Sequence, residues 1–238
     1  MVRKQLGIVG LAVMVVAFAA AAQAVDLTVS NPSFETNGLA DGGKATTTPS
    51  GWSLGNGSSG QAVTWNPLNV SFAGATGGNL PSPAAGPQAL LLQSGTVETP
   101  VVYQFLSDTV QANKIYTLTT AIGTPLDQGY GGFSVGLYGF SFSTFAQTQL
   151  AYTDDTNATV PPVNGSGLFY NEVASFNSND YPSNWGDRLV VIVGGGVGTA
   201  LDNVRVTVTP EPGAAILLGT GALASLLVCV WRRRHRTK

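Results

Sequence analysis

The apolar residues between positions 25 and 209 occur in short runs, and none of these runs keeps a helical period. Glycine, proline and asparagine separate the runs, and several of them alternate apolar with polar residues, which is typical of strands with one buried face. We expect strands at 27–35, 62–72, 88–94, 101–106, 114–123, 133–142, 167–176, 188–196 and 201–209. The pattern predicts an all-β protein whose middle region is a single β-sandwich.

Two details refine this prediction. The run RLVVIV at 188–193 is almost continuously β-branched, so we expect a central strand that is covered on both faces. GGGVG (194–198) follows it, but no helix comes next that could bind a phosphate, so a hairpin or bulged connection is expected. The long segments 36–61 and 72–87 are rich in glycine, serine, threonine and proline and are predicted to be loops.

The composition excludes several functions. The region 25–209 has four basic residues and twelve of the thirteen acidic residues of the chain, so it cannot neutralise a run of phosphates, and nucleic-acid binding is not expected. The only cysteine is Cys229 and the only histidine is His235, and both lie near the C-terminus. The middle region therefore contains no disulfide, no cysteine-based zinc site and no histidine-dependent catalytic group.

The N-terminus has the organisation of a secretory signal peptide. A short basic segment, MVRKQ, precedes the apolar segment LGIVGLAVMVVAFAAAA, and small residues stand at Ala22 and Ala24. We predict a signal peptide at 1–24 with cleavage after Ala24. The alternative is an anchor helix that is not cleaved.

The C-terminus contains a second apolar segment. Residues 213–231 carry no charge and are long enough to cross a bilayer as one helix. The basic tail 232–238 follows, with Arg232, Arg233 and Arg234 directly after the segment, which favours a cytoplasmic position for this end. The predicted domains are thus the signal peptide, the β-sandwich at 25–209, and a C-terminal signal at 210–238.

The order Pro210-Glu211-Pro212, apolar segment, arginine cluster and chain end resembles the PEP-CTERM sorting signal of exported bacterial proteins. The resemblance implies recognition by an exosortase-type membrane enzyme while the helix lies in the inner membrane. Removal of the helix and delivery to the cell surface or the medium would follow. The same tail is also similar to the ice-binding protein C-terminal domain, a name that implies no ice binding by this body.

The two prolines also predict, without the family, an extended and accessible linker, because they fix φ and cannot continue a regular ladder. A protease at the membrane needs such a segment, and Glu211 would be the residue that it recognises. The alternative is an ordinary stalk in front of a permanent anchor.

The body itself resembles the jelly rolls of the galactose-binding, carbohydrate-binding-module-like type. NPSFET (31–36) and PSGWS (49–53) are similar to the opening of such domains, and LDNVRV (201–206) to their closing strand. The resemblance implies a structural calcium ion between the first and the last strand, held by Glu35 and Asp202. Calcium needs six to eight oxygen ligands, so two carboxylates are only part of a shell. The alternative is that both residues are solvated or hydrogen-bonded at strand ends.

Aromatic residues in predicted loops suggest a sugar-binding patch. Tyr181 and Trp185 lie in NDYPSNWGD, and Tyr130 lies in DQGYGG, each close to side chains that can hydrogen bond to a sugar. The alternative is that these rings fix their loops to the core, as large aromatic residues usually do.

A carboxylate pair for catalysis is not evident. Asp154 and Asp155 are adjacent in a turn-like segment and are interpreted as solvated, and nothing brings Asp180 and Asp187 to the distance that a glycosidase needs. We therefore expect an exported, surface-sorted, non-catalytic protein that binds exopolysaccharide in the extracellular matrix. The alternative is a secreted carbohydrate-active hydrolase whose carboxylates are not identified.

Overall fold

The computed structural model describes residues 23–45, 47–55, 61–75, 79–93, 100–158 and 162–211. The predicted membrane segment and the predicted signal peptide, except for Gln23 and Ala24, lie outside these residues. Within them, none of the helices has the length and apolar character needed to span a bilayer. The strands are β1 (Val25–Leu27), β2 (Ser53–Leu54), β3 (Gln61–Trp65), β4 (Ala89–Gln93), β5 (Val101–Thr109), β6 (Lys114–Gly123), β7 (Phe133–Ser141), β8 (Ala146–Asp154), β9 (Phe169–Asn177), β10 (Arg188–Gly195) and β11 (Ala200–Pro210). The 3-10 turns are η1 (Glu35–Asn37), η2 (Ser178–Asp180) and η3 (Pro182–Asn184).

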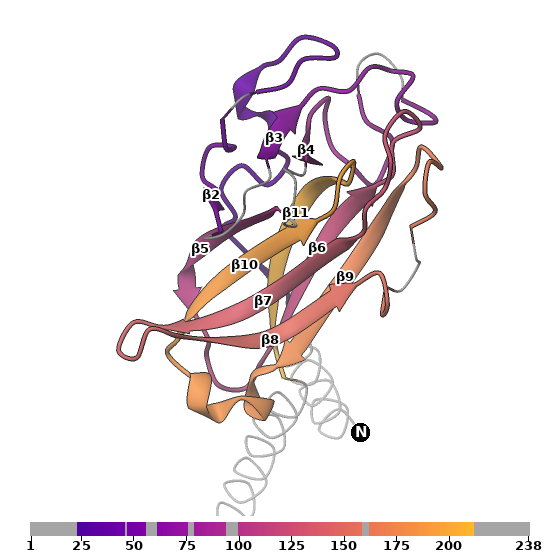
Figure 1. The fold of residues 1–238 in the computed structure, drawn as a ribbon. Coiled ribbons are helices and arrows are strands. Elements are labelled where there is room, and N and C mark those ends of the chain that lie inside the picture. The colour runs from indigo at the N-terminus through magenta and orange to yellow at the C-terminus, as the bar shows by residue number, and fades with distance from the viewer. Residues whose placement is uncertain are drawn as a thin grey trace, which may run out of the picture.

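The strands form two antiparallel sheets that pack face to face (Figure 1). One sheet has the order β3-β4-β11-β6-β9, with β1 paired to β11, and the other has the order β2-β5-β10-β7-β8. β10, which contains the RLVVIV run, is the middle strand of the five-stranded sheet, as its sequence predicts. The predicted all-β sandwich is confirmed.

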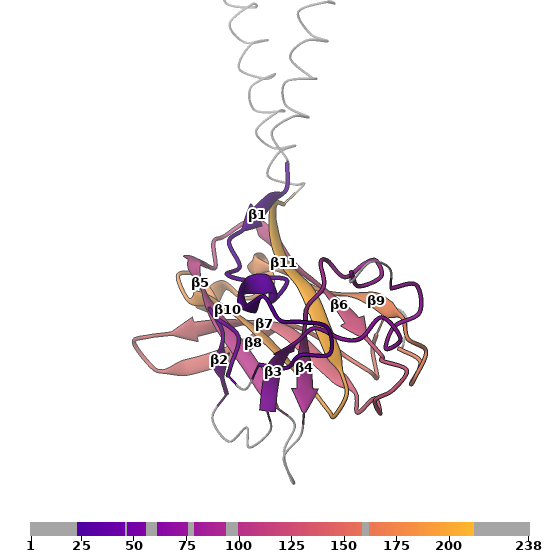
Figure 2. The same ribbon diagram turned by 90° about the horizontal axis from the view of Figure 1, so that it is seen from above.

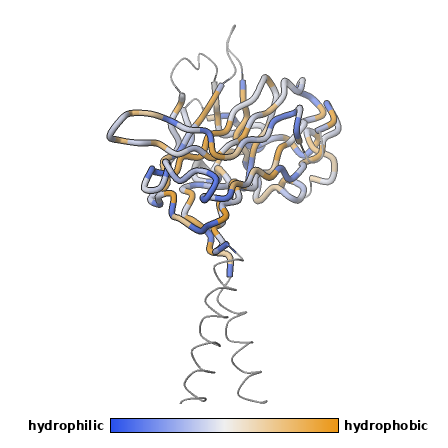
Figure 3. Tube along the Cα trace, turned by 90° about the horizontal axis from the view of Figure 1, so that it is seen from below, coloured by the Kyte–Doolittle hydropathy of each residue, from blue (hydrophilic) through white to orange (hydrophobic). Residues whose placement is uncertain are grey.

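The core lies between the sheets and is built by alternation along the strands. Leu118 and Ile122 of β6 face Leu137 of β7 and Val191 of β10, and all four side chains are completely buried. Each such side chain contributes about 1.5–3 kcal/mol to folding through loss of contact with water. Figure 3 shows apolar and hydrophilic residues interleaved along the chain of the body.

Two sequence predictions differ from the structure. The run 27–35 is not one strand, because Asn31 (φ 48°) and Phe34 (φ 56°) adopt left-handed backbone conformations that end the strand at Leu27. Conversely, β8 was not predicted. It is an edge strand rich in glutamine and threonine, with only Leu150, Ala151 and Thr153 buried, so its apolar pattern is weak.

The ends of the described chain lie together. β1 pairs with β11, with Val25 opposite Val208, so both ends leave the sandwich side by side (Figure 2). β11 begins opposite Gly123 and ends opposite Lys114 of β6. The β6–β7 and β10–β11 loops are therefore at the end of the sandwich that is opposite to Pro210.

Candidate functional site

The outer face of the five-stranded sheet carries clustered aromatic side chains. Alternation along β5 and β7 places Tyr103, Phe105 and Phe140 on this face and buries most of the residues between them. The Phe105 ring lies 5.7 Å from Tyr103 and 5.4 Å from Phe140, edge to face in both cases. Phe142 follows β7, with its ring 5.0 Å from Phe140. These four residues are called the aromatic cluster.

The aromatic cluster is open to solvent although its rings are apolar. Phe105 is 38% exposed and Phe142 is 58% exposed. Edge-to-face pairs stabilise each other by about 0.5–1.5 kcal/mol, so the rings hold a defined arrangement on the surface. Contiguous apolar patches on protein surfaces are often binding surfaces, so this cluster is a candidate for one.

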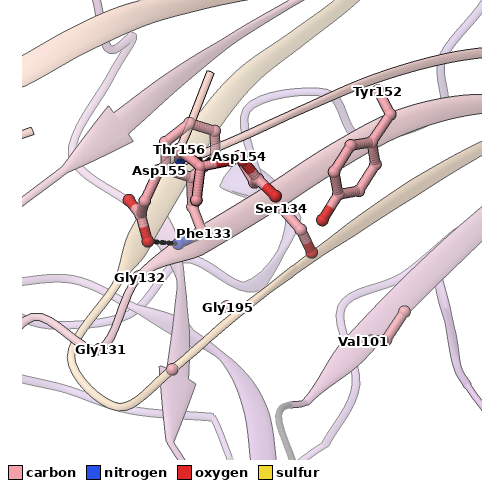
Figure 4. A pocket seen from close by; sticks show the side chains of 11 residues that line it. Val101, Gly131, Gly132, Phe133, Ser134, Tyr152, Asp154, Asp155, Thr156 and Gly195 are labelled. Atoms are coloured by element: carbon pink, nitrogen blue, oxygen red, sulfur yellow. Dashed lines mark hydrogen bonds between the residues drawn. The ribbon is translucent and has the colours of Figure 1, made fainter. Parts of the chain in front are cut away.

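A cavity of about 380 Å³ opens at one end of the same face (Figure 4). Every second residue of β7 faces the same side of the sheet, and these positions hold Ser134, Gly136, Tyr138 and Phe140. Ser134 lines the cavity and Phe140 belongs to the aromatic cluster, so the cavity and the cluster share one face. The cavity is lined by Val101, Gly131, Gly132, Phe133, Ser134, Tyr152, Asp154, Asp155, Thr156, Gly195 and Gly196.

A bulge in β8 brings Tyr152 to this face. The pairing with β7 shifts between Leu137 and Tyr138, so that Ala151 lies opposite Leu137 while Gln149 lies opposite Tyr138. Gln149 and Tyr152 are both exposed although they are three residues apart. The extra residue in the bulge therefore turns Tyr152 outward, as bulges beside functional sites commonly do.

Tyr152 and Asp154 form a coupled pair at the cavity wall. The hydroxyl of Tyr152 points toward Asp154 and Ser134 (Figure 4). Burial raises the pKa of Tyr152, and the hydrogen bond to Asp154 raises it further, while Ser134 lowers it. The pKa of Asp154 is lowered because the Thr156 hydroxyl and N–H donate to its Oδ1, at 2.6 and 2.9 Å. At neutral pH the pair therefore consists of a protonated phenol beside a carboxylate.

Asp155 forms the other acidic wall. Its Oδ1 accepts a hydrogen bond from the Tyr130 hydroxyl, and its Oδ2 accepts one from the Phe133 N–H at 3.1 Å. Burial raises the pKa of Tyr130, and Asp155 adds to this effect. Asp154 and Asp155, which the sequence suggested were solvated turn residues, thus both line the cavity.

Gly194 lies beside two of the residues that line the cavity. A Cβ atom on Gly194 would lie 3.1 Å from both the Ser134 Oγ and the Val101 Cγ2. A larger residue would fill the space between these two cavity residues. The described lining residues contain two aspartates and no lysine or arginine, so the cavity favours groups that carry or develop positive charge.

Glu35 and Asp202 are brought to the same loop, which contacts Asp202 on the central strand β11. The Ala85 N–H donates to the Asp202 Oδ2 at 2.6 Å, and the Gln88 N–H donates to the Glu35 Oε1 at 2.9 Å. Asp202 is completely buried, and burial raises its pKa to about 8, with a further contribution from the charge of Glu35. Burial also raises the pKa of Glu35, although hydrogen bonds from Gln88 oppose this effect.

The donor set at this place fits a hard cation. The Oδ1 of Asp202 is buried and accepts no hydrogen bond from the described residues, which is costly for a carboxylate oxygen unless a cation compensates it. The described residues contain no group of three or more potential histidine, cysteine, aspartate or glutamate ligands. A calcium ion here would need backbone carbonyls and water for the rest of its shell.

The three predicted aromatic ligand-binding residues do not form one patch. Tyr130 lies in the β6–β7 loop beside the cavity. Tyr181 packs edge to face on Phe176, with ring centroids 5.8 Å apart, at the opposite end of the sandwich. Trp185 is there as well, 47% exposed, and its Nε1–H donates to the Ser178 carbonyl at 2.9 Å.

The predicted sorting residues are only partly within the described chain. Pro210 ends β11 and pairs with Lys114, and Glu211 contacts the body through hydrogen bonds. The expected free linker therefore does not include these two residues. Pro212, Arg232, Arg233 and Arg234 lie outside the described residues.

Fold and site together define a β-sandwich protein with a small-molecule cavity on the outer face of one sheet. The chain belongs to the HpiC1-like family, because the model of the HpiC1 cyclase family matches residues 25–207. No curated protein matches the chain.

Solved structures show the same fold. The Stig cyclase Fisc from Fischerella sp. TAU, in complex with (3Z)-3-(1-methyl-2-pyrrolidinylidene)-3H-indole, has a TM-score of 0.62 at 20% identity, covering 79% of this chain and 100% of that chain. A cyclase from Fischerella sp. TAU in complex with 4-(1H-indol-3-yl)butan-2-one has a TM-score of 0.60 at 20% identity, covering 79% and 98%.

The family corrects the functional prediction. A non-catalytic matrix protein that binds exopolysaccharide was expected, and a carbohydrate-active hydrolase was the alternative, but the family is one of cyclases and hence of enzymes. A body without histidine and cysteine can still be an enzyme, because tyrosine and carboxylate groups are sufficient for proton transfer.

The sequence analysis did not predict the aromatic cluster or the Tyr152–Asp154 pair. One signal was available: aromatic residues alternate with other residues in LYGFSF (137–142) and VYQF (102–105). This alternation puts several rings on one face of a strand. The role of Tyr152 had no such signal, because it depends on the bulge in β8.

Proposed function

We propose that this protein is a cyclase that closes a ring on a substrate with an indole or similar aromatic group, on the outer face of the five-stranded sheet. The single observation that carries the proposal is that the aromatic cluster and the acidic cavity share this face. Indole-bearing ligands in the cyclase structures from Fischerella sp. support the substrate class. The rings would hold the aromatic group by stacking, and the cavity would hold the part that reacts.

The cavity supplies acid and base groups for such a reaction. The Tyr152 hydroxyl donates a hydrogen bond to a heteroatom of the substrate and polarises it, while Asp154 stabilises the positive charge that develops. A ring carbon then attacks the carbon of the polarised carbon–heteroatom double bond, so that the carbon–carbon bond forms as this π bond breaks towards the heteroatom, and the ring carbon loses its proton to Asp154. The proton returns through Tyr152 to the heteroatom, so the reaction is an isomerisation with no net gain or loss of protons.

The experiment uses 4-(1H-indol-3-yl)butan-2-one as a binding probe for the full chain in detergent. Calorimetry should show binding, and Phe140→Ala should weaken it about tenfold, because a stacked ring contributes roughly 1–1.5 kcal/mol. The control is Tyr170→Phe, which changes a ring on the six-stranded sheet and should leave binding unchanged. If neither the probe nor related indoles bind, or if both variants behave alike, the proposal is wrong.

Calcium is proposed as a structural ion. Glu35 and Asp202 would hold it, and the orphaned Oδ1 of Asp202 supports this assignment. The ion would join the segment after β1 to β11 and would favour the charged form of two carboxyl groups whose pKa values are raised by burial. It would stand apart from the proton transfers at Tyr152 and Asp154.

Export and sorting are proposed from the two terminal segments. The signal peptide at 1–24 would direct export, and the C-terminal signal at 210–238 would place the protein in the inner membrane for an exosortase-type enzyme. The protein would then reach the cell surface or the medium. Mass spectrometry of the protein from its own cells tests this: an N-terminus at Val25 and loss of the basic tail would support it, and a chain that ends at Lys238 would contradict processing.

A further inference from the structure

The Glu211 side chain is fixed to the end of the sandwich, although its sequence context predicts a free linker. Its Oε1 accepts a hydrogen bond from the Asn177 Nδ2 at 3.0 Å, and its Oε2 accepts one from the Asn179 Nδ2 at 2.5 Å. Its backbone N–H donates to the Asn113 carbonyl at 3.0 Å. Hydrogen bonds to a charged group are the stronger ones in proteins, so this is a well-held residue.

The three asparagines are joined to each other as well. The Asn113 N–H donates to the Asn179 Oδ1 at 3.1 Å, and the Asn179 Nδ2 donates to the Asn113 Oδ1 at 3.2 Å. The Asn179 N–H donates to the Asn177 Oδ1 at 2.9 Å. We call Asn113, Asn177 and Asn179 the Asn cradle. It ties the β5–β6 turn, the β9–η2 connection and the end of β11 into one unit.

Very few residues separate the fixed Glu211 from the apolar segment. Pro210 is already paired with Lys114 in the ladder between β11 and β6. The apolar segment begins at Gly213, so one residue, Pro212, separates it from the cradle. A segment that crossed the membrane would therefore hold the body close to the bilayer without a stalk.

This arrangement matters for proteolysis. An endoprotease acts on chain that is locally open, and the rate of cleavage follows the fraction of molecules in which the segment has left the fold. Residues 209–211 are in the ladder or in the cradle. Release of Glu211 is therefore the first step in opening this junction.

We propose that Glu211 and the Asn cradle form a latch that controls proteolytic separation of the body from its C-terminal segment. The inference rests on the proposed processing of the tail. With the latch closed, residues 209–211 are held against the body and are protected. When Glu211 leaves the cradle, the last residues of β11 fray and the junction becomes long enough to enter a protease.

The test is digestion of the full chain in detergent with proteinase K, followed by intact mass over time. The wild-type chain should resist cleavage between residues 207 and 211. Asn179→Ala removes hydrogen bonds to Glu211 and Asn113 and should speed cleavage there about tenfold. Asn171→Ala is the matched control, because Asn171 is exposed on β9 and lies far along the strand from the cradle. Proteinase K should cleave this variant at the wild-type rate.

A second variant, Glu211→Gln, distinguishes release of the latch from misfolding of the protein. Glu211→Gln keeps one carbonyl acceptor but turns an amide toward the Asn179 amide, and a change at the end of β11 does not reach the core. It should also speed cleavage, with unchanged circular dichroism. Equal rates in wild type, Asn179→Ala and Glu211→Gln would overturn the latch. That result is distinct from failure of the processing proposal, which shows as an intact tail on protein from its own cells.

Discussion

Asp202 and Glu35 come from distant parts of the chain, yet they accept hydrogen bonds from the same loop, through the Ala85 and Gln88 N–H groups. Asp202 lies on β11, at the centre of its sheet, and Glu35 lies in η1. The loop residue Gly86 (φ 74°) allows the approach, because a Cβ there would lie 2.4 Å from the Glu35 Oε1. A buried Asp202 beside a half-buried Glu35 predicts a dependence of stability on calcium.

Calcium should raise the melting temperature, and Asp202→Asn should abolish the effect. Asparagine still accepts the Ala85 N–H but lacks the charge that the ion needs. At a hundredfold excess over its Kd, calcium would stabilise the fold by about 2.7 kcal/mol. The measurement is thermal unfolding with calcium or with a chelator, with exposed Asp41→Asn as the control. Equal melting temperatures with calcium and chelator would contradict the assignment.

Tyr116→Phe should destabilise the sandwich. The Tyr116 ring is buried and stacks on Phe176 at 4.9 Å, and its hydroxyl accepts the Gln111 N–H at 2.9 Å. Phenylalanine keeps the stack but leaves that donor unsatisfied, which costs about 1–2 kcal/mol. Urea unfolding measures the loss. Tyr138→Phe is the control, because its hydroxyl bonds to exposed Gln149, and it should change stability by less than about 0.5 kcal/mol.

Much of the fold could be predicted because strand patterns are local. β6 coincides with the predicted run 114–123, and β10 was expected as a central strand, since buried strands carry strong apolar patterns. β8 was missed because an edge strand needs few apolar residues. The left-handed backbone at Phe34 was also not foreseeable, since phenylalanine carries no signal for it.

The site was less predictable because it depends on register. Glu35 and Asp202 were paired through resemblance to a known type of domain, and the structure does bring them to one loop. Tyr152, Asp154 and Ser134 meet only because β7 and β8 are neighbours with Ser134 opposite Asp154. Without the strand order, no spacing in the sequence joins residue 134 to residue 154.

Phe145→Asn should stabilise the protein. Phe145 lies in the β7–β8 connection with φ of 55° and is 78% exposed, so its ring contributes little burial while its backbone is strained. Asparagine adopts left-handed backbone more readily, and the gain should be about 0.5–1 kcal/mol. Urea unfolding of the variant tests this. Phe142→Asn is the comparison: no left-handed backbone favours asparagine there, and it loses contacts in the aromatic cluster, so it should not stabilise.

Gly194→Val should close the cavity and prevent ligand binding. The new side chain would extend from a Cβ that already lies 3.1 Å from the Ser134 Oγ and the Val101 Cγ2, so its two branches would crowd or displace these lining residues. Valine suits a strand, and the crowding should cost no more than about 1–3 kcal/mol, so the sandwich should still fold. Binding of 4-(1H-indol-3-yl)butan-2-one should fall at least tenfold in calorimetry.

Gly129→Val is the matched control, because a Cβ at Gly129 meets no atom within 4 Å, and the affinity of this variant should equal that of wild type. Wild-type affinity in a folded Gly194→Val protein would place the ligand elsewhere than in this cavity.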